Sequence, residues 1–138
     1  MSKNSKDIVL TSALRSSVGK FGGNHKKLQS HELGSIVIKG ILDKTKMDVQ
    51  EIDEVILGQV LPSLSGQNPA RQALIKSGIP KEKTAFNINQ VCGSGLRAIV
   101  LGYQSIGMGS SKFVIAGGQE SMSNSNEKEM LTNGLIDA

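Results

Sequence analysis

The amino-acid sequence predicts an α/β fold, layered as β-α-β-α-β-α-β around a mostly parallel sheet. Short apolar runs alternate along the chain with segments of helical periodicity, and residues 55–57 form a continuous Val-Ile-Leu run of the kind buried in a parallel sheet. Strands that alternate with helices pair in parallel through right-handed crossovers. Only 3% of the residues are aromatic and none is Trp, so we expect an aliphatic core.

The first predicted elements are a short strand and a long helix. Residues 8–10, Ile-Val-Leu, are expected to form the strand, and a glycine-containing loop follows at residues 15–23. The helix is expected from about His31, with Ser30 as its N-cap and Glu32 in its first turn. The apolar stripe of this helix is predicted to consist of Leu33, Ile36, Val37 and Ile41.

Three strands and two helices are predicted to follow. The strands are expected at residues 54–60, 85–91 and 113–116. One helix opens at Asn68-Pro69, with Asn as cap and Pro at the first helical position, and ends at Gly78. The other runs from residue 93 or 94 to about residue 107. Its predicted apolar side consists of Leu96, Ile99, Val100 and Tyr103.

Composition narrows the classes of function. The formal net charge is +4, but there is no run of like charges and no aromatic residue among the basic ones, which argues against nucleic-acid binding. The mildly basic surface is compatible with an anionic cofactor or with a solvated face that has no partner. The longest apolar runs are too short to span a bilayer, and the polar lead before Ile8 leaves no room for a signal or transit peptide. The single cysteine gives no sign of an oxidising compartment, so we expect the cytoplasm.

Cys92 is the candidate nucleophile, and no metal site is assigned. It lies at the junction between the predicted strand 85–91 and the next helix, where the helix dipole and unpaired N–H groups stabilise a thiolate. Gly93 and Gly95 leave space beside the sulfur for a substrate carbonyl, and backbone N–H groups there can stabilise an oxyanion. A lone cysteine next to an apolar strand is also commonly a small buried hydrophobe, and the residues alone leave both interpretations open.

Four segments in order resemble the thiolase family. Asn-Gln-Val-Cys-Gly-Ser-Gly at 89–95 is similar to its nucleophile segment, and Arg-Ser-Ser-Val-Gly-Lys-Phe-Gly-Gly at 15–23 resembles its opening loop. Gly-Gln-Asn-Pro-Ala-Arg-Gln-Ala at 66–73 resembles its second helix. Ala-Gly-Gly-Gln-Glu-Ser-Met-Ser at 116–123 resembles the strand end after the nucleophile helix. The β-ketoacyl synthases and hydroxymethylglutaryl-CoA synthases share the fold, but the segments at 66–73 and 116–123 fit thiolases better.

The resemblance implies a thiolase-like N-terminal half that transfers an acetyl or acyl group between coenzyme A thioesters, forming or cleaving acetoacetyl-CoA. Cys92 would attack the thioester and hold the acyl group, with its own backbone N–H in the oxyanion hole. Coenzyme A thioesters would be substrates, and no cofactor would be bound permanently. Residues 67–71 lie where the family forms subunit contacts, which implies a homo-oligomer, either a dimer or a tetramer.

Part of the family's active site has no counterpart in this sequence. Thiolases also use a His in a Gly-His-Pro context and a second Cys, but this chain has one cysteine, and both His25 and His31 are expected to be exposed polar residues. We expect residues 1–124 to form the N-terminal α/β domain. Residues 125–138 resemble a shortened remnant of the coenzyme A-binding loop domain, so no residue is assigned to cofactor binding. The alternative function is a non-catalytic association module, or a truncated remnant that needs a complementary partner.

Overall fold

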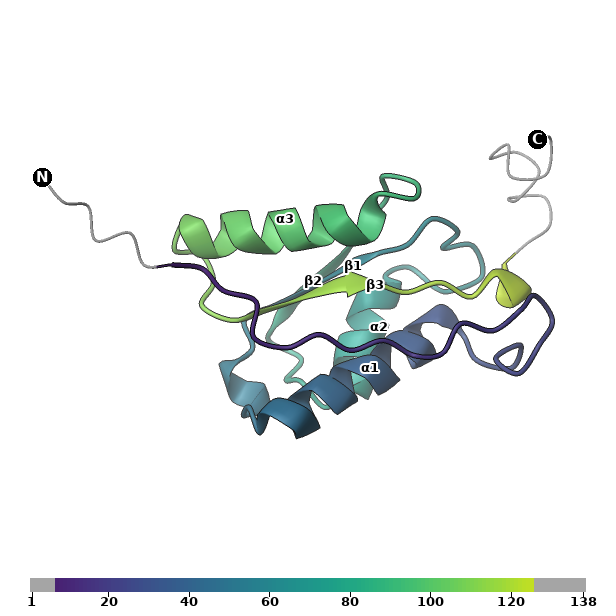
Figure 1. The fold of residues 1–138 in the computed structure, drawn as a ribbon, viewed down its shortest axis with the longest axis horizontal. Coiled ribbons are helices and arrows are strands. Elements are labelled where there is room, and N and C mark those ends of the chain that lie inside the picture. Colours follow the sequence, from purple (N-terminus) through teal and green to yellow (C-terminus); the bar gives the residue numbers. More distant parts are fainter. Residues whose placement is uncertain (1–6, 126–138) are drawn as a thin grey trace, which may run out of the picture.

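In the computed structural model, which describes residues 7–125, helices cover both faces of a three-stranded parallel sheet (Figure 1). The strands are β1 (Glu54–Gly58), β2 (Thr84–Ile88) and β3 (Val114–Gly118). The helices are α1 (Ser30–Thr45), α2 (Pro69–Lys76) and α3 (Ser94–Gly107), with short 3-10 turns at Val49–Glu51 and Met122–Asn124. The predicted α/β class and parallel pairing are therefore confirmed. No helix within residues 7–125 combines the length and apolar character needed to cross a bilayer.

The strand order β2-β1-β3 places β1 at the centre of the sheet. Gly58 at the end of β1 pairs with Ile88 on one side and with Gly118 on the other, so the three strands end at the same edge. Helices α1 and α2 lie against one face and α3 lies against the other (Figure 1). The segments that follow the three strands therefore start side by side at this edge.

The core lies between the sheet and the pair α1 and α2. Val55 and Leu57 of β1 point into it, together with Ile38 of α1 and Leu74 of α2. Ile56, between the two inward-pointing residues of β1, is 1% exposed. Successive side chains of a strand point to opposite faces, so the Val-Ile-Leu run is buried on both sides, as predicted.

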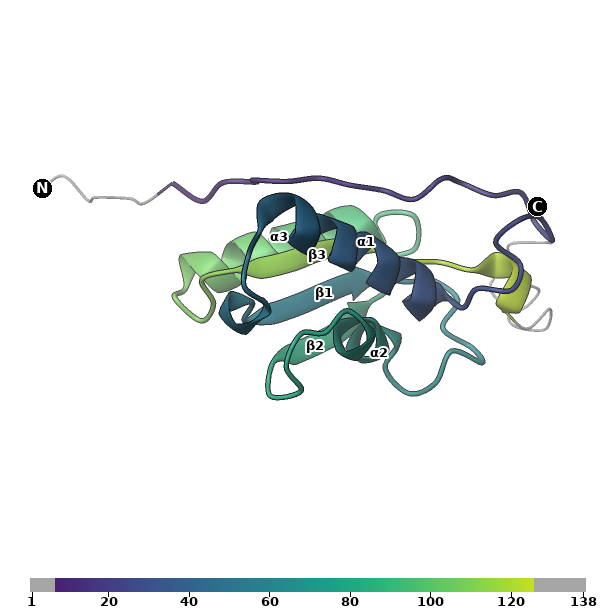
Figure 2. The ribbon, with the colours of Figure 1, turned by 90° about the horizontal axis from the view of Figure 1, so that it is seen from below.

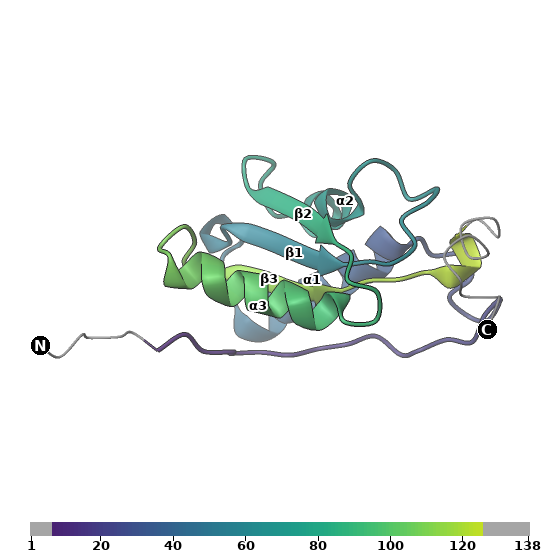
Figure 3. The same cartoon turned by 90° about the horizontal axis from the view of Figure 1, so that it is seen from above.

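The predicted first strand at residues 8–10 is wrong. This segment runs extended along the β3 side of the sheet without joining it (Figures 2 and 3), and Leu10 is 85% exposed. A run of three apolar residues becomes a strand only when a neighbouring strand pairs with its backbone. Here side-chain contacts hold the segment instead: Ile8 lies next to Gly107 of α3, and Leu14 lies over Gly40 of α1.

The buried face of α1 also differs from the predicted stripe. Ile36 is 54% exposed, and the buried positions include Gly34, Ile38 and Leu42. His31, predicted to be an exposed polar residue, is only 8% exposed because it lies on this same face. A Cβ on Gly34 would lie 3.4 Å from that of Ala73, so a small residue lets α1 approach α2 closely at this point.

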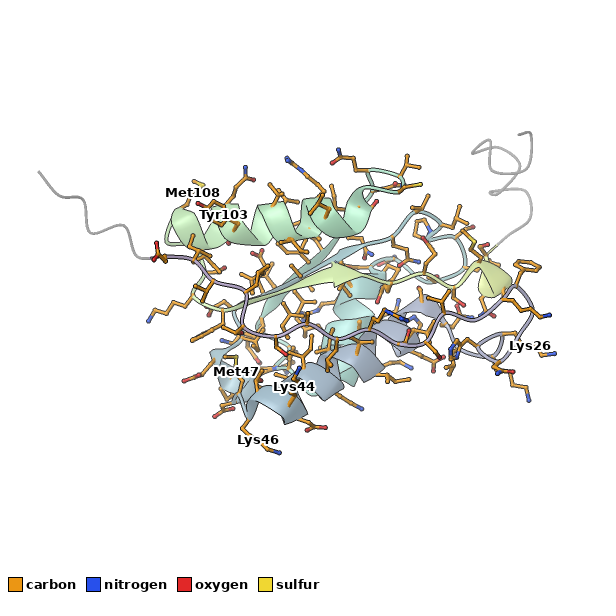
Figure 4. The ribbon with its side chains drawn as sticks, viewed as in Figure 1. Lys26, Lys44, Lys46, Met47, Tyr103 and Met108 are labelled. Atoms are coloured by element: carbon orange, nitrogen blue, oxygen red, sulfur yellow. The ribbon has the colours of Figure 1, made fainter. Side chains whose placement is uncertain are left out.

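Small residues likewise set the packing of α3. Its buried positions are Ser94, Ala98 and Gly102, and a Cβ on Gly102 would lie 3.1 Å from Val114 Cγ1 of β3. Leu96 and Tyr103, predicted to share an apolar side, are 69% and 60% exposed. Tyr103 and the exposed Met108, which follows the last residue of α3, lie at the C-terminal end of this helix (Figure 4). The apolar stripe of α3 therefore faces outward in this chain.

Candidate functional site

A hollow of about 330 Å³ lies at the edge where β1 and β3 end, beside the start of α3. It is lined by Gly58, Gln59, Val60, Val91, Cys92, Ser94, Gly95, Gly118, Gln119 and Glu120. Cys92 is exposed and lies between β2 and α3, at the predicted strand-to-helix junction. Ligands of open α/β sheets gather at the carboxyl ends of the strands, which is where this hollow lies.

The turn that carries Cys92 contains a strained residue. Val91 has a φ of +50°, a left-handed conformation that a β-branched side chain rarely adopts. The Oδ1 atom of Asn89 accepts the N–H of Val91 at 2.9 Å, a local bond that supports the tight turn. The hydroxyl of Ser94 accepts the N–H of Gln90 at 2.8 Å and donates to the carbonyl of Val91 at 2.6 Å. These side chains hold the backbone on both sides of the thiol.

The first turn of α3 packs directly on the end of β1. A Cβ on Gly58 would lie 2.5 Å from the carbonyl carbon of Ser94 and 2.7 Å from the backbone nitrogen of Gly95, so only glycine fits there. The first N–H groups of a helix have no acceptor within the helix and carry a partial positive charge. The close packing therefore brings the anion-stabilising end of α3 to the edge of the sheet, beside Cys92.

Buried amide groups lie behind the hollow. The side chain of Gln59 is 3% exposed; its Nε2 donates to the hydroxyl of Ser30 at 2.9 Å, and its Oε1 accepts from Gln119 Nε2 at 3.1 Å and from Asn87 Nδ2 at 3.4 Å. The backbone N–H of Gln119 also donates to the carbonyl of Gly58. Buried polar networks of this kind specify one arrangement of the groups that they join. Here they join the ends of all three strands to the start of α1.

Glu120 connects the ends of β3 and β1 beyond the last ladder pair. Its carboxylate accepts the N–H of Val60 at 2.7 Å and the N–H of Leu61 at 3.4 Å. A charged acceptor strengthens such bonds to backbone N–H groups. The wall of the hollow formed by Val60 is therefore held by a side chain from the neighbouring strand.

The titratable groups with shifted pKa values lie outside the hollow. Burial lowers the pKa of the His31 imidazole, and the charge of Lys76 lowers it further. The backbone N–H of Gln29, followed by the ammonium of Lys76, lowers the pKa of Glu32. The backbone N–H groups of Lys112 and Phe113 lower the pKa of Asp53. None of these groups lines the hollow.

The two histidines are also outside the hollow. His25 is half-buried, and its Nε2 lies 2.9 Å from the hydroxyl of Ser17. The Nδ1 atom of His31 is buried without a hydrogen-bond partner. Within the described part of the chain, no three side chains of His, Cys, Asp or Glu are grouped so that they could hold a metal ion.

Reasoning from the sequence identified Cys92 but assigned no part in the site to Asn89, Gln59 or Glu120. All three are polar residues that come directly or almost directly after a strand of the parallel sheet. That position is a usable signal, because the carboxyl ends of parallel strands meet at one edge. Their hydrogen bonds could not be derived from spacing, because they join positions 29 to 60 residues apart: Asn89 and Glu120 bond to Val60, and Gln59 bonds to Gln119.

Comparison with known proteins identifies the family. Residues 8–134 match the model of the N-terminal domain of thiolase. An acetyl-CoA acetyltransferase of Rhizobium meliloti is 55% identical over 116 residues, which are 84% of this chain and 30% of the relative. A probable acetyl-CoA acyltransferase of Staphylococcus epidermidis is 53% identical over 118 residues, which are 86% of this chain and 30% of the relative.

A solved structure agrees with the sequence relatives. The crystal structure of the Bacillus anthracis acetyl-CoA acetyltransferase superposes with a TM-score of 0.82 at 37% sequence identity, and the match covers 86% of this chain and 30% of that chain. The chain thus spans about 30% of the length of the relatives that it matches.

Proposed function

Because this chain belongs to the thiolase family, we propose that it carries the acyl-accepting cysteine of an acetyl-CoA C-acetyltransferase. The observation that carries this proposal is the position of Cys92, an exposed thiol on the hollow, two residues before the first residue of α3. The substrates are coenzyme A thioesters, and the reaction forms or cleaves acetoacetyl-CoA.

In the proposed reaction, the thiolate of Cys92 attacks the carbonyl carbon of the thioester. A bond forms between that carbon and Sγ, the bond to the coenzyme A sulfur breaks, and coenzyme A leaves as a thiolate that takes up a proton from solvent. The N–H of Cys92 stabilises the oxyanion of the tetrahedral intermediate. The acyl group then passes from Sγ to the carbanion of a second acetyl-CoA, or to the coenzyme A thiol in the reverse direction.

We propose that the chain alone performs the acylation step but not the complete cycle. The sequence has one cysteine, and neither of its histidines lies at the hollow, so within residues 7–125 the hollow has neither the histidine nor the second cysteine that the family uses. Acetoacetyl-CoA cleavage that depends on coenzyme A should therefore not exceed the rate of a Cys92→Ala control. A rate clearly above that of the control would show that the complete reaction does not need catalytic residues from outside this chain.

The acyl-accepting role is tested by the rate of Cys92 alkylation with iodoacetamide at neutral pH, followed by mass spectrometry of the intact chain. If the fold presents the thiol as a nucleophile, the rate should be higher in the folded chain than in the same chain unfolded in urea. Equal rates would contradict the role.

Three further parts of the proposal rest on the family. They are the absence of a permanently bound cofactor, a dimeric or tetrameric assembly, and a division into a domain at residues 1–124 and a loop-domain remnant at 125–138. All but one residue of that remnant lies outside the described residues. The proposed cytoplasmic location rests on the sequence alone, through its single cysteine and its polar start.

A second candidate function is supported by α3. Its exposed Leu96, Val100 and Tyr103 form an apolar stripe that nothing in residues 7–125 covers. Uncovered apolar stripes of this kind are typical of association surfaces. The chain would then act as a non-catalytic module that associates with a complementary partner, and its thiol would be inert.

A further inference from the structure

We propose that Asn89 is a positioning residue for Cys92, which it controls by holding Val91 in its left-handed conformation. The inference rests on the proposed acyl-accepting role of Cys92 and adds a residue on which the geometry of the thiol depends. It follows from a series of hydrogen bonds that begins at Glu120 and ends at the residue before the nucleophile.

The first part of the series fixes the backbone of Val60. Glu120 Oε2 accepts its N–H at 2.7 Å. The carbonyl of the same residue accepts from Asn89 Nδ2 at 3.2 Å. Val60 lies just beyond β1 and Glu120 just beyond β3. Asn89 therefore bonds to a backbone carbonyl whose residue is fixed by the ends of two strands.

The second part connects Asn89 to the strained turn. Its Oδ1 atom accepts the N–H of Val91 at 2.9 Å, so one amide group bonds the wall of the hollow and the turn simultaneously. Asparagine can do this because it carries a donor and an acceptor on one planar group. A valine at φ +50° is otherwise disfavoured, because its Cβ comes too close to the following carbonyl oxygen, so the turn requires such support.

The position of Val91 determines that of Cys92, because Cys92 is the next residue. If Val91 relaxed to a negative φ, the thiol would leave its place at the start of α3, where the first N–H groups of the helix carry a partial positive charge. Asn89 therefore acts on the reactivity of Cys92 through the backbone of Val91, without contacting the substrate.

The test is a double-mutant cycle on the rate of Cys92 alkylation by iodoacetamide, with circular dichroism to verify the fold. Asn89→Ala should slow alkylation at neutral pH by about threefold to tenfold, since one net hydrogen bond contributes roughly 0.5–1.5 kcal/mol. In a Val91→Gly background the same substitution should change the rate by less than about twofold, because glycine adopts a positive φ without support. Asn24→Ala, in an exposed loop, is the matched control and should leave the rate unchanged.

Two outcomes would overturn the inference: an unchanged rate in folded Asn89→Ala, or an equal loss of rate in the wild-type and Val91→Gly backgrounds. If Asn89→Ala did not fold, Asn89→Ser replaces it and the same two comparisons decide. The comparison of folded wild type with urea-unfolded wild type tests the proposed function, whereas the comparison among folded variants tests Asn89. The two failures are therefore distinguishable.

Discussion

Gly58 and Ser94 approach so closely that a Cβ on Gly58 would lie 2.5 Å from the carbonyl carbon of Ser94. This contact fixes the first turn of α3 against the end of β1. The site thus depends on a backbone-to-backbone contact as well as on the thiol itself.

Gly58→Ala should destabilise the chain and displace the start of α3. The added methyl group meets backbone atoms that cannot rotate away, so we expect a loss of about 1–3 kcal/mol in the free energy of unfolding, measured by urea denaturation. Gly117→Ala in β3 is the matched control, because a Cβ there meets nothing within 4 Å and the change should stay within about 0.5 kcal/mol. Equal effects of the two substitutions would show that the close approach does not determine stability.

Lys46→Gly should stabilise the chain. Lys46 ends α1 with a φ of +55°, which is costly for a residue with a Cβ and free of steric cost for glycine. We expect a gain of about 1 kcal/mol in the free energy of unfolding. Lys44→Gly, in the last turn of the same helix, should instead cost about 1 kcal/mol; both lysines lie at the same end of α1 (Figure 4). A loss of stability in Lys46→Gly would contradict the assigned conformation.

The free energy of unfolding should decrease as the pH is lowered below 6.5, because of His31. Burial lowers the pKa of this imidazole below 6.5, so the folded state binds a proton less readily than the unfolded state. The contribution of His31 is therefore complete above pH 6.5 and is lost as the pH falls through the lowered pKa.

Urea denaturation at a series of pH values between 6.5 and 4.5 measures this loss. The carboxylates of Glu32 and Asp53, whose pKa values are lowered from 4.5 and 3.8, lose their contributions mainly below this range. His31→Gln should make the free energy of unfolding nearly independent of pH within it. An unchanged slope in His31→Gln would assign the loss to other groups.

The apolar stripe of α3 should make the chain associate. Leu96 and Tyr103 are 69% and 60% exposed, and removing such side chains from water contributes roughly 1.5–3 kcal/mol each. Sedimentation velocity should show a mass that rises with concentration in the wild type and that is lower in Leu96→Lys with Tyr103→Lys. Lys39→Ala, on α1, is a control that should leave the association unchanged. A monomer at all concentrations would remove the support for an association module.

The sequence was sufficient for the parts of the fold that depend on local pattern. The strand at 54–58 was recognisable from its Val-Ile-Leu run, and the helix at α2 from Asn68 and Pro69, because burial and capping leave local signals. Residues 8–10 were predicted as a strand incorrectly, since an apolar run does not reveal whether a partner strand is available.

The faces of the helices were harder to predict. In α3 the buried positions are occupied by small residues such as Gly102, and in α1 they include Gly34 as well as Ile38 and Leu42, so the predicted apolar stripes did not coincide with the buried faces. At the hollow, the place of Cys92 between a strand and a helix could be predicted from the sequence. The support from Asn89 and Glu120 was not, because it depends on contacts between distant segments.

We propose that Cys92 accepts an acyl group because of where the fold holds it. The most direct measurement is the rate of acetyl transfer to Cys92 from the acetyl thioester of N-acetylcysteamine, followed by mass spectrometry of the intact chain, in buffer and in urea. We predict that the folded chain is acetylated faster than the urea-unfolded chain, and that Cys92→Ala gains no acetyl group under the same conditions. Equal rates in buffer and urea, or acetylation that persists in Cys92→Ala, would contradict the claim.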